Sequence, residues 1–116
     1  MPLLFVYGTL KKNGLANHLL GGSKFITTER IKGYALYDYY GYYPFAIYTS
    51  QPTDFIVGEF YEVQEKDLVK LDDYEGEMYE KYFDTTGQFY IYLKKNGRHE
   101  DFKKIESGDW FEYIAT

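Results

Sequence analysis

The stretch Leu3-Leu4-Phe5-Val6-Tyr7-Gly8-Thr9-Leu10 joins a continuous apolar run to an abrupt stop at a glycine. An apolar run without alternation is typical of a central strand that is covered on both faces. A glycine turn at the end of such a strand leaves backbone N–H groups free to hold a carboxylate or a developing oxyanion. We therefore expect residues 3–6 to form a central strand. The turn after it is either a candidate binding loop or a plain connection to the next element.

Much of the remaining chain has the pattern of short strands. Phe55, Val57, Tyr61 and Val63 alternate on one face of a single run, and Glu59 breaks the apolar series on that face. Other strands are predicted at residues 25–36 with a break near Gly33, and at 44–48, 79–84, 88–93, near Ile105 and at 110–113, the last two as a strand or an extended tail.

Residues 65–75 have the spacing of a helix. Leu68, Leu71 and Glu75 recur at i, i+3 and i+7 and so share one face, and Gly76 is placed to end the helix.

A second, short helix is predicted at residues 15–20, closed by Gly21-Gly22. So much strand in so short a chain favours an α+β fold. We expect a small mixed β-barrel of about five to seven strands with flanking short helices, because closure removes exposed sheet edges.

Composition narrows the possible functions. A chain of 116 residues is expected to form one domain, residues 1–116. The net charge of −5 disfavours a nucleic-acid partner, although the 22% aromatic content could stack bases. The absence of cysteine excludes thiol nucleophiles, disulfides, iron–sulfur clusters and thiolate zinc sites. The first residues lack a basic segment and a long apolar run, so we expect no signal peptide, no membrane span and a cytoplasmic location.

No metal site is predicted. His18 and His99 have no Cys, His or HExxH-type partner nearby, and the simpler interpretation is that both lie at the surface. No serine lies in a Gly-x-Ser-x-Gly elbow.

Glu75 stands out within the acidic segment 72–80. Its four acidic neighbours Asp72, Asp73, Glu77 and Glu80 fit a solvated helix end, whereas Glu75 shares the face of the apolar leucines. Burial, the negative end of the helix dipole and nearby carboxylates would all raise its pKa. A carboxylate of this kind suits general acid–base catalysis near neutral pH, and the alternative is a buried structural Glu bonded to a Tyr hydroxyl.

The order and spacing of several short motifs resemble the γ-glutamylcyclotransferase-like family, which includes the γ-glutamylaminecyclotransferases and the avirulence-induced plant proteins. The matching pieces are Val6-Tyr7-Gly8-Thr9-Leu10, Gly14 with Asn17-His18 and Leu20, Gly33-Tyr34-Ala35-Leu36-Tyr37-Asp38, Tyr43-Pro44, Val57-Gly58-Glu59-Phe60-Tyr61, Leu71-Asp72-Asp73-Tyr74-Glu75-Gly76 with Tyr79, and Ser107-Gly108-Asp109-Trp110.

The resemblance implies a reaction that uses no cofactor. The α-amino group of a γ-glutamyl compound attacks its own γ-carbonyl, which yields 5-oxoproline and a released amine or amino acid. It implies that Glu75 is the general base and that Tyr7, Gly8, Thr9 and Leu10 form the substrate-binding loop. Tyr43 and Tyr79 are weaker candidates for the pocket wall, and the expected partner is a small γ-glutamyl molecule.

One position departs from the family pattern. The family often has Arg two residues after the tyrosine matched to Tyr79, and this chain has Lys81, which keeps the charge but loses the planar fork. The alternative function is a ligand-binding or interaction module that keeps the pocket without catalysis. A desolvated base in the pocket argues against that alternative.

Overall fold

Strand β1 (Leu3–Val6) lies at the centre of the larger sheet, as predicted. The structure is a computed structural model that describes residues 2–14 and 16–115. Strand β1 pairs antiparallel with β5 (Phe55–Glu62) and parallel with β7 (Phe89–Lys94). Leu4 packs in one apolar cluster and Phe5 in another, so both faces of the strand are covered.

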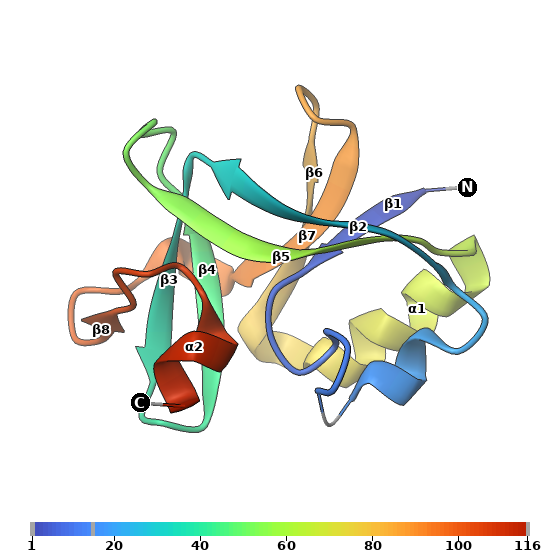
Figure 1. The fold of residues 1–116 in the computed structure, drawn as a ribbon, viewed down its shortest axis with the longest axis horizontal. Helices are drawn as coiled ribbons and strands as arrows, with labels where there is room; N and C mark the ends of the chain where they lie inside the picture. Colours follow the sequence, from blue (N-terminus) through green and yellow to red (C-terminus); the bar gives the residue numbers. More distant parts are fainter. Residues whose placement is uncertain (1, 15, 116) are drawn as a thin grey trace.

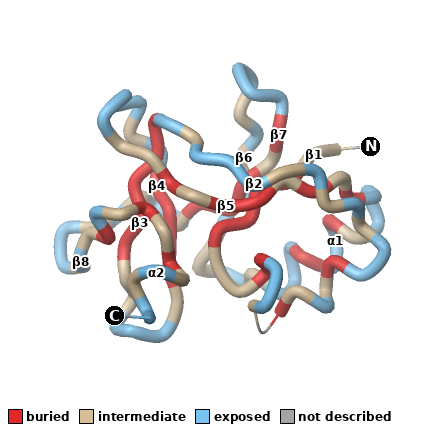
Figure 2. The backbone as a smooth tube through the Cα atoms, in the orientation of Figure 1, coloured by how far each residue is buried: buried red, intermediate tan, exposed pale blue. Residues whose placement is uncertain are grey.

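The larger sheet has five strands in the order β2-β5-β1-β7-β6. The edge strands are β2 (Lys24–Lys32) and β6 (Tyr79–Asp84). Strand β2 is exposed along much of its length (Figure 2). Its exposed charged side chains are Lys24, Glu29, Arg30 and Lys32.

The smaller sheet has three strands in the order β4-β3-β8, and it stands beside the larger one (Figure 1). It comprises β3 (Tyr34–Tyr39), β4 (Tyr43–Tyr48) and the short β8 (Lys103–Lys104). The predicted barrel is therefore wrong, because the two sheets are not closed on each other. At Gly33 the backbone has φ +89° and turns away from the larger sheet. The charged side chains of β2 protect the edge that closure would have removed.

Helix α1 (Glu65–Glu75) has the predicted bounds. Its buried residues Leu68 and Leu71 pack in the same cluster as Leu4, on one face of the larger sheet. Gly76 ends the helix with φ +71°, and its N–H donates to the carbonyl of Asp72.

Within residues 2–14 and 16–115, three short 3₁₀ turns complete the connections. The short helix predicted at residues 15–20 is the turn η1 (Asn17–Leu20), and residue 15 lies outside the described residues. The turn η2 (Gly76–Met78) follows α1, and η3 (Lys95–Gly97) follows β7.

The C-terminal segment is a helix, α2 (Trp110–Ala115), where a strand or extended tail was expected. Asp109 explains the difference, because its carboxylate accepts hydrogen bonds from the N–H groups of Phe111 and Glu112 and so caps the first turn. Trp110 packs in the cluster that contains Phe5. Among the described residues, no helix is long and apolar enough to cross a membrane.

Candidate active site

A cavity of about 300 Å³ opens where β1 ends, between the following loop, the end of α1 and strand β4. All seven side chains and loop positions predicted as site residues line this one cavity: Tyr7, Gly8, Thr9, Leu10, Tyr43, Glu75 and Tyr79. The other lining residues are Phe5, Val6, Pro44, Tyr74, Met78 and Tyr92. Residues separated by most of the chain thus meet around a single space.

Glu75 is the only acidic or basic side chain among the described residues that line the cavity. Helix α1 carries it there because Glu75 follows Leu68 and Leu71 on the buried face, one turn after Leu71. Burial raises the pKa of Glu75 to about 7. Its carboxylate makes no hydrogen bond or ion pair with any described side chain, so its oxygens remain available to a ligand. Of the three predicted causes of the pKa shift, desolvation is the one that the structure shows.

The hydroxyls of three cavity tyrosines are engaged with other parts of the protein. Tyr7 Oη donates to the carbonyl of Tyr92 at 2.6 Å and accepts from the N–H of Ala46 at 3.2 Å. Tyr79 Oη donates to the carbonyl of Pro44 at 2.6 Å.

Tyr43 Oη lies 3.2 Å from Met78 Sδ. Burial raises the pKa of Tyr7 and of Tyr79, and Glu75 contributes in both cases, so the three groups share one electrostatic environment. The tyrosines therefore shape the cavity wall, and their hydroxyl protons are committed to the protein.

The loop after β1 exposes donors rather than acceptors. The carbonyls of Gly8, Thr9 and Leu10 accept from Lys11 N, Ala16 N and Asn17 Nδ2, at 3.0, 3.0 and 2.7 Å. The N–H groups of residues 8, 9 and 10 have no acceptor among the described residues. Three consecutive unpaired N–H groups beside a cavity form a concave donor site suited to an anion or a developing negative charge.

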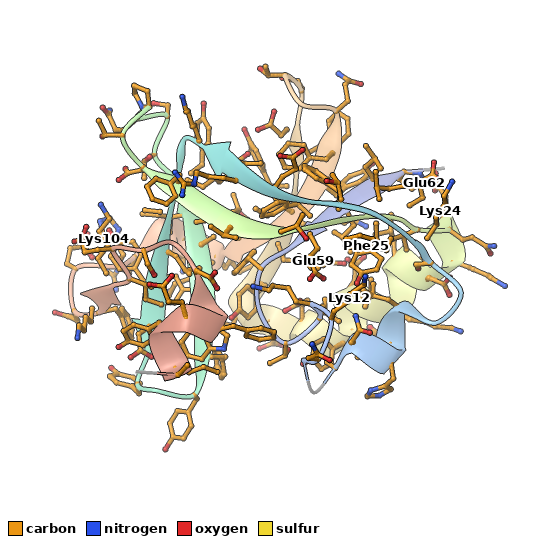
Figure 3. All side chains as sticks on the ribbon, in the orientation of Figure 1. Lys12, Lys24, Phe25, Glu59, Glu62 and Lys104 are labelled. Atoms are coloured by element: carbon orange, nitrogen blue, oxygen red, sulfur yellow. The ribbon has the colours of Figure 1, made fainter. Side chains whose placement is uncertain are left out.

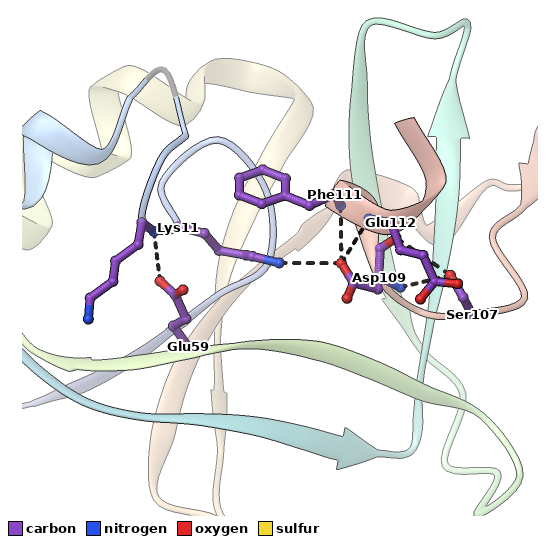
Figure 4. A network of polar contacts seen from close by, with 7 residues as sticks. Lys11, Glu59, Ser107, Asp109, Phe111 and Glu112 are labelled. Carbon is purple, nitrogen blue, oxygen red and sulfur yellow. Dashed lines mark hydrogen bonds and ion pairs between the residues drawn. The ribbon is translucent and has the colours of Figure 1, made fainter. Parts of the chain in front are cut away.

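A partly buried ion pair joins the loop to the C-terminal helix. Lys11 is 6% exposed, and its ammonium lies 3.5 Å from Asp109 Oδ1 and 4.3 Å from the centre of the Phe111 ring (Figure 4). Lys11, the residue directly after the donor site, is thus already paired with the carboxylate that caps α2. The anion-binding capacity of the cavity therefore rests on backbone groups.

Sequence reasoning missed Tyr74 and Tyr92 as cavity residues. Tyr74 Oη and Thr9 Oγ1 lie 2.9 Å apart, which links the end of α1 to the loop. Tyr92 Oη donates to Asp72 Oδ1 at 2.6 Å. Tyr74 adjoins Glu75 in the sequence and could have been found from that position. Tyr92 reaches the cavity only through the parallel pairing of β7 with β1, for which the sequence carries no local signal.

The remaining candidates lie elsewhere. His18 is exposed, and His99 packs on Tyr37, with ring centres 4.9 Å apart; neither lines the cavity. Lys81 Nζ lies 3.1 Å from Asp72 Oδ2, so this lysine stabilises the acidic end of α1. The described residues hold no group of three or more His, Asp or Glu side chains placed to bind a metal ion.

The chain matches a known protein family over most of its length. The family model described as "Gamma-glutamyl cyclotransferase, AIG2-like" matches residues 4–112. The chain belongs to this family.

Two curated relatives of the γ-glutamylcyclotransferase family match the chain. "Putative gamma-glutamylcyclotransferase YkqA" of Bacillus subtilis is 35% identical over 96% of this chain and 42% of its own length. "Putative gamma-glutamylcyclotransferase MJ1514" of Methanocaldococcus jannaschii is 42% identical over 66% of this chain and 62% of its own length. The chain thus spans less than two thirds of each relative.

The fold of this family member also matches a solved structure. The crystal structure of the uncharacterized protein PH0828 from Pyrococcus horikoshii superposes with a TM-score of 0.80 at 27% identity, over 99% of this chain and 94% of that one.

Proposed function

We propose that the protein is a γ-glutamylcyclotransferase that converts a γ-glutamyl amino acid or γ-glutamyl amine to 5-oxoproline and the free amine. The observation that carries the proposal is the pairing, in one cavity, of an unbonded carboxylate whose pKa is about 7 with three unpaired backbone N–H groups. The family description and the names of the two relatives agree with this chemistry.

In the proposed reaction Glu75 handles the proton. The substrate's α-ammonium gives up a proton to the Glu75 carboxylate, and the freed amine attacks the γ-carbonyl carbon of the same molecule. The C–N bond to the leaving group then breaks as the leaving nitrogen takes a proton back from Glu75. The ring nitrogen, which still carries the extra proton of the attacking amine, passes that proton through Glu75 to the released amine. A group with a pKa near the working pH can do both, because accepting and returning the proton cost similar free energy.

In the same proposal, the loop binds negative charge. The N–H groups of residues 8–10 hold the substrate α-carboxylate and the oxyanion that forms on the γ-carbonyl. No basic side chain among the described residues lines the cavity, so these backbone dipoles would be the main source of positive potential. One preorganised oxyanion donor contributes about 3–4 kcal/mol to transition-state stabilisation.

Orientation contributes the rest. Nucleophile and electrophile belong to one molecule, so the cavity needs only to hold the glutamyl chain in a ring-forming conformation. Such positioning is worth roughly 7–11 kcal/mol in favourable intramolecular reactions. The packed walls formed by Tyr7, Tyr43 and Tyr79 supply a fixed shape for that conformation.

The experiment is release of 5-oxoproline from a panel of γ-glutamyl compounds: amino acids, ε-(γ-glutamyl)lysine, glutathione and simple amines. Wild type and Glu75→Gln are assayed side by side, and we expect release by wild type alone. Release by neither protein, together with a thermal shift on adding 5-oxoproline, would instead favour a binding module. Equal release by both would exclude Glu75 as the base.

A further inference from the structure

Glu59 interrupts the apolar face of β5, and the site described above does not use it. Its Oε1 accepts from the N–H of Lys12 at 2.8 Å and from Tyr61 Oη at 3.1 Å. Asn17 Nδ2 donates to Tyr61 Oη at 3.3 Å and to the carbonyl of Leu10 at 2.7 Å. An unbroken chain of hydrogen bonds therefore joins the loop at residue 10 to the loop at residue 12 through three side chains.

Burial of the Glu59 carboxylate costs free energy unless hydrogen bonds or an ion pair compensate for it. The residue is 7% exposed and forms no ion pair with any described residue. Lys12 gives Glu59 only its backbone N–H. The Lys12 ammonium lies instead 3.8 Å from the centre of the Phe25 ring (Figure 3). A buried carboxylate without a cation depends on hydrogen-bond donors for its stability. The donors it has are a loop N–H and the Tyr61 phenol.

The base of this chain of bonds is rigid. Glu59 and Tyr61 lie two residues apart on the same face of β5, and they pair in register with Val6 and Leu4 of β1. Burial and the neighbouring Glu59 raise the pKa of Tyr61, so its hydroxyl remains a proton donor. The loop is thus tied to β5, the strand paired with the central strand β1, rather than to a surface segment.

We propose that Glu59, Tyr61 and Asn17 form a positioning unit that holds residues 8–12 in the conformation that leaves the N–H groups of the loop free. Asn17 occupies the carbonyl of Leu10, and Glu59 occupies the N–H of Lys12. With the loop fixed at both points, the N–H groups of residues 8–10 cannot reorient to form hydrogen bonds within the protein. None of the three side chains lines the cavity, so they act through the loop.

The unit is tested with Tyr61→Phe, which keeps the ring packed edge-on against Phe25 at 5.6 Å and removes only the shared hydroxyl. The matched control is Tyr90→Phe, because the Tyr90 hydroxyl has no hydrogen bond to a described residue and lies outside the cavity. The readouts are the backbone amide resonances of residues 8–12 by ¹⁵N NMR, the melting temperature, and kcat and KM for 5-oxoproline release.

We expect Tyr61→Phe to remain folded, to shift the amide resonances of residues 8–12, and to lower kcat/KM by roughly 10-fold to 100-fold, as small displacements of positioning groups do. Tyr90→Phe should match wild type in all three readouts. Glu59→Gln, whose amide oxygen still accepts from Lys12, should retain more activity than Glu59→Ala.

Unmoved loop resonances in folded Tyr61→Phe would overturn the proposal, whether or not activity falls. Equal activity of Glu59→Gln and Glu59→Ala in folded protein would also overturn it. The catalytic readout rests on the proposed function, whereas the resonances do not. If wild type released no 5-oxoproline from any compound, the proposed function would fail while the resonances still tested the positioning unit.

Discussion

Replacing Glu75 with glutamine should have opposite effects on catalysis and on stability, because both depend on the burial of one carboxylate. A rise in pKa from 4.5 in the unfolded chain to about 7 in the folded protein corresponds to about 3 kcal/mol at 1.36 kcal/mol per pKa unit. The side chain is partly open to water, so we expect about 2–3 kcal/mol in practice.

The sign follows from linkage. A folded-state pKa above the unfolded value means that the stability contributed by the protonated carboxyl is fully present below about pH 4.5. That contribution is lost as the pH rises through about 7. Glu75→Gln has no proton to lose, so it should match wild type near pH 4 and be more stable by about 2–3 kcal/mol at about pH 8. For a chain of this length that difference is roughly 10 °C in melting temperature.

The assay combines two measurements on the same samples. Melting temperatures between about pH 4 and pH 8 report stability, and 5-oxoproline release reports catalysis, which should fall by about 10²–10⁴ when a general base is removed. Wild-type kcat/KM should rise with pH through an apparent pKa near 7. Glu77→Gln, which removes an exposed carboxylate two residues away, is the charge control.

Two results would refute this reasoning. A Glu75→Gln protein with wild-type turnover would show that the proton moves through another group. Identical pH dependence of melting for wild type and the variant would show that burial does not penalise the Glu75 charge.

Four further substitutions test close packing, at the cavity and within the larger sheet. Gly8→Ala would place a Cβ 2.9 Å from Pro44 Cγ, so the loop must shift by a few tenths of an ångström; we expect kcat/KM to fall about 10-fold with little change in melting temperature. Gly58→Ala would place a Cβ 2.3 Å from a carbonyl oxygen of β1, and we expect urea denaturation to show a loss of about 3 kcal/mol; a loss under about 0.5 kcal/mol would contradict the close approach. Thr9→Val removes the 2.9 Å contact with Tyr74, and steady-state kinetics should show a raised KM with stability changed by less than about 1 kcal/mol. Tyr74→Phe should reproduce the effect, and unchanged KM in both would mean that this contact does not shape the cavity.

Local patterns in the sequence predicted most of the elements. The 3.6-residue spacing of Leu68, Leu71 and Glu75 predicted both the helix and the buried position of the carboxylate, because both follow from one short-range periodicity. The uninterrupted apolar run identified β1 as central, because a strand covered on both faces shows no alternation with polar residues. These predictions needed no knowledge of long-range pairing.

The errors arose where long-range or polar contacts decide the structure. Closure into a barrel depends on which sheet edges pair; here the backbone turns away at Gly33, and the charged side chains of β2 protect an open edge. The C-terminal helix depends on the Asp109 cap, which overrides the aromatic, strand-like composition of the segment.

The tyrosine hydroxyls that bridge the two sheets have a consequence for the size of molecule that the cavity admits. Tyr7 reaches Ala46 and Tyr79 reaches Pro44, so two phenol rings from the larger sheet and its loop span the gap to β4. Each tyrosine side chain has a fixed length, and together the two set the distance between the cavity walls. An open two-sheet fold without such spacers could widen or narrow as it fluctuates. Here the covalent length of the two tyrosines fixes the width of the cavity. A relative with a shorter side chain at either position should therefore accept a substrate of different size.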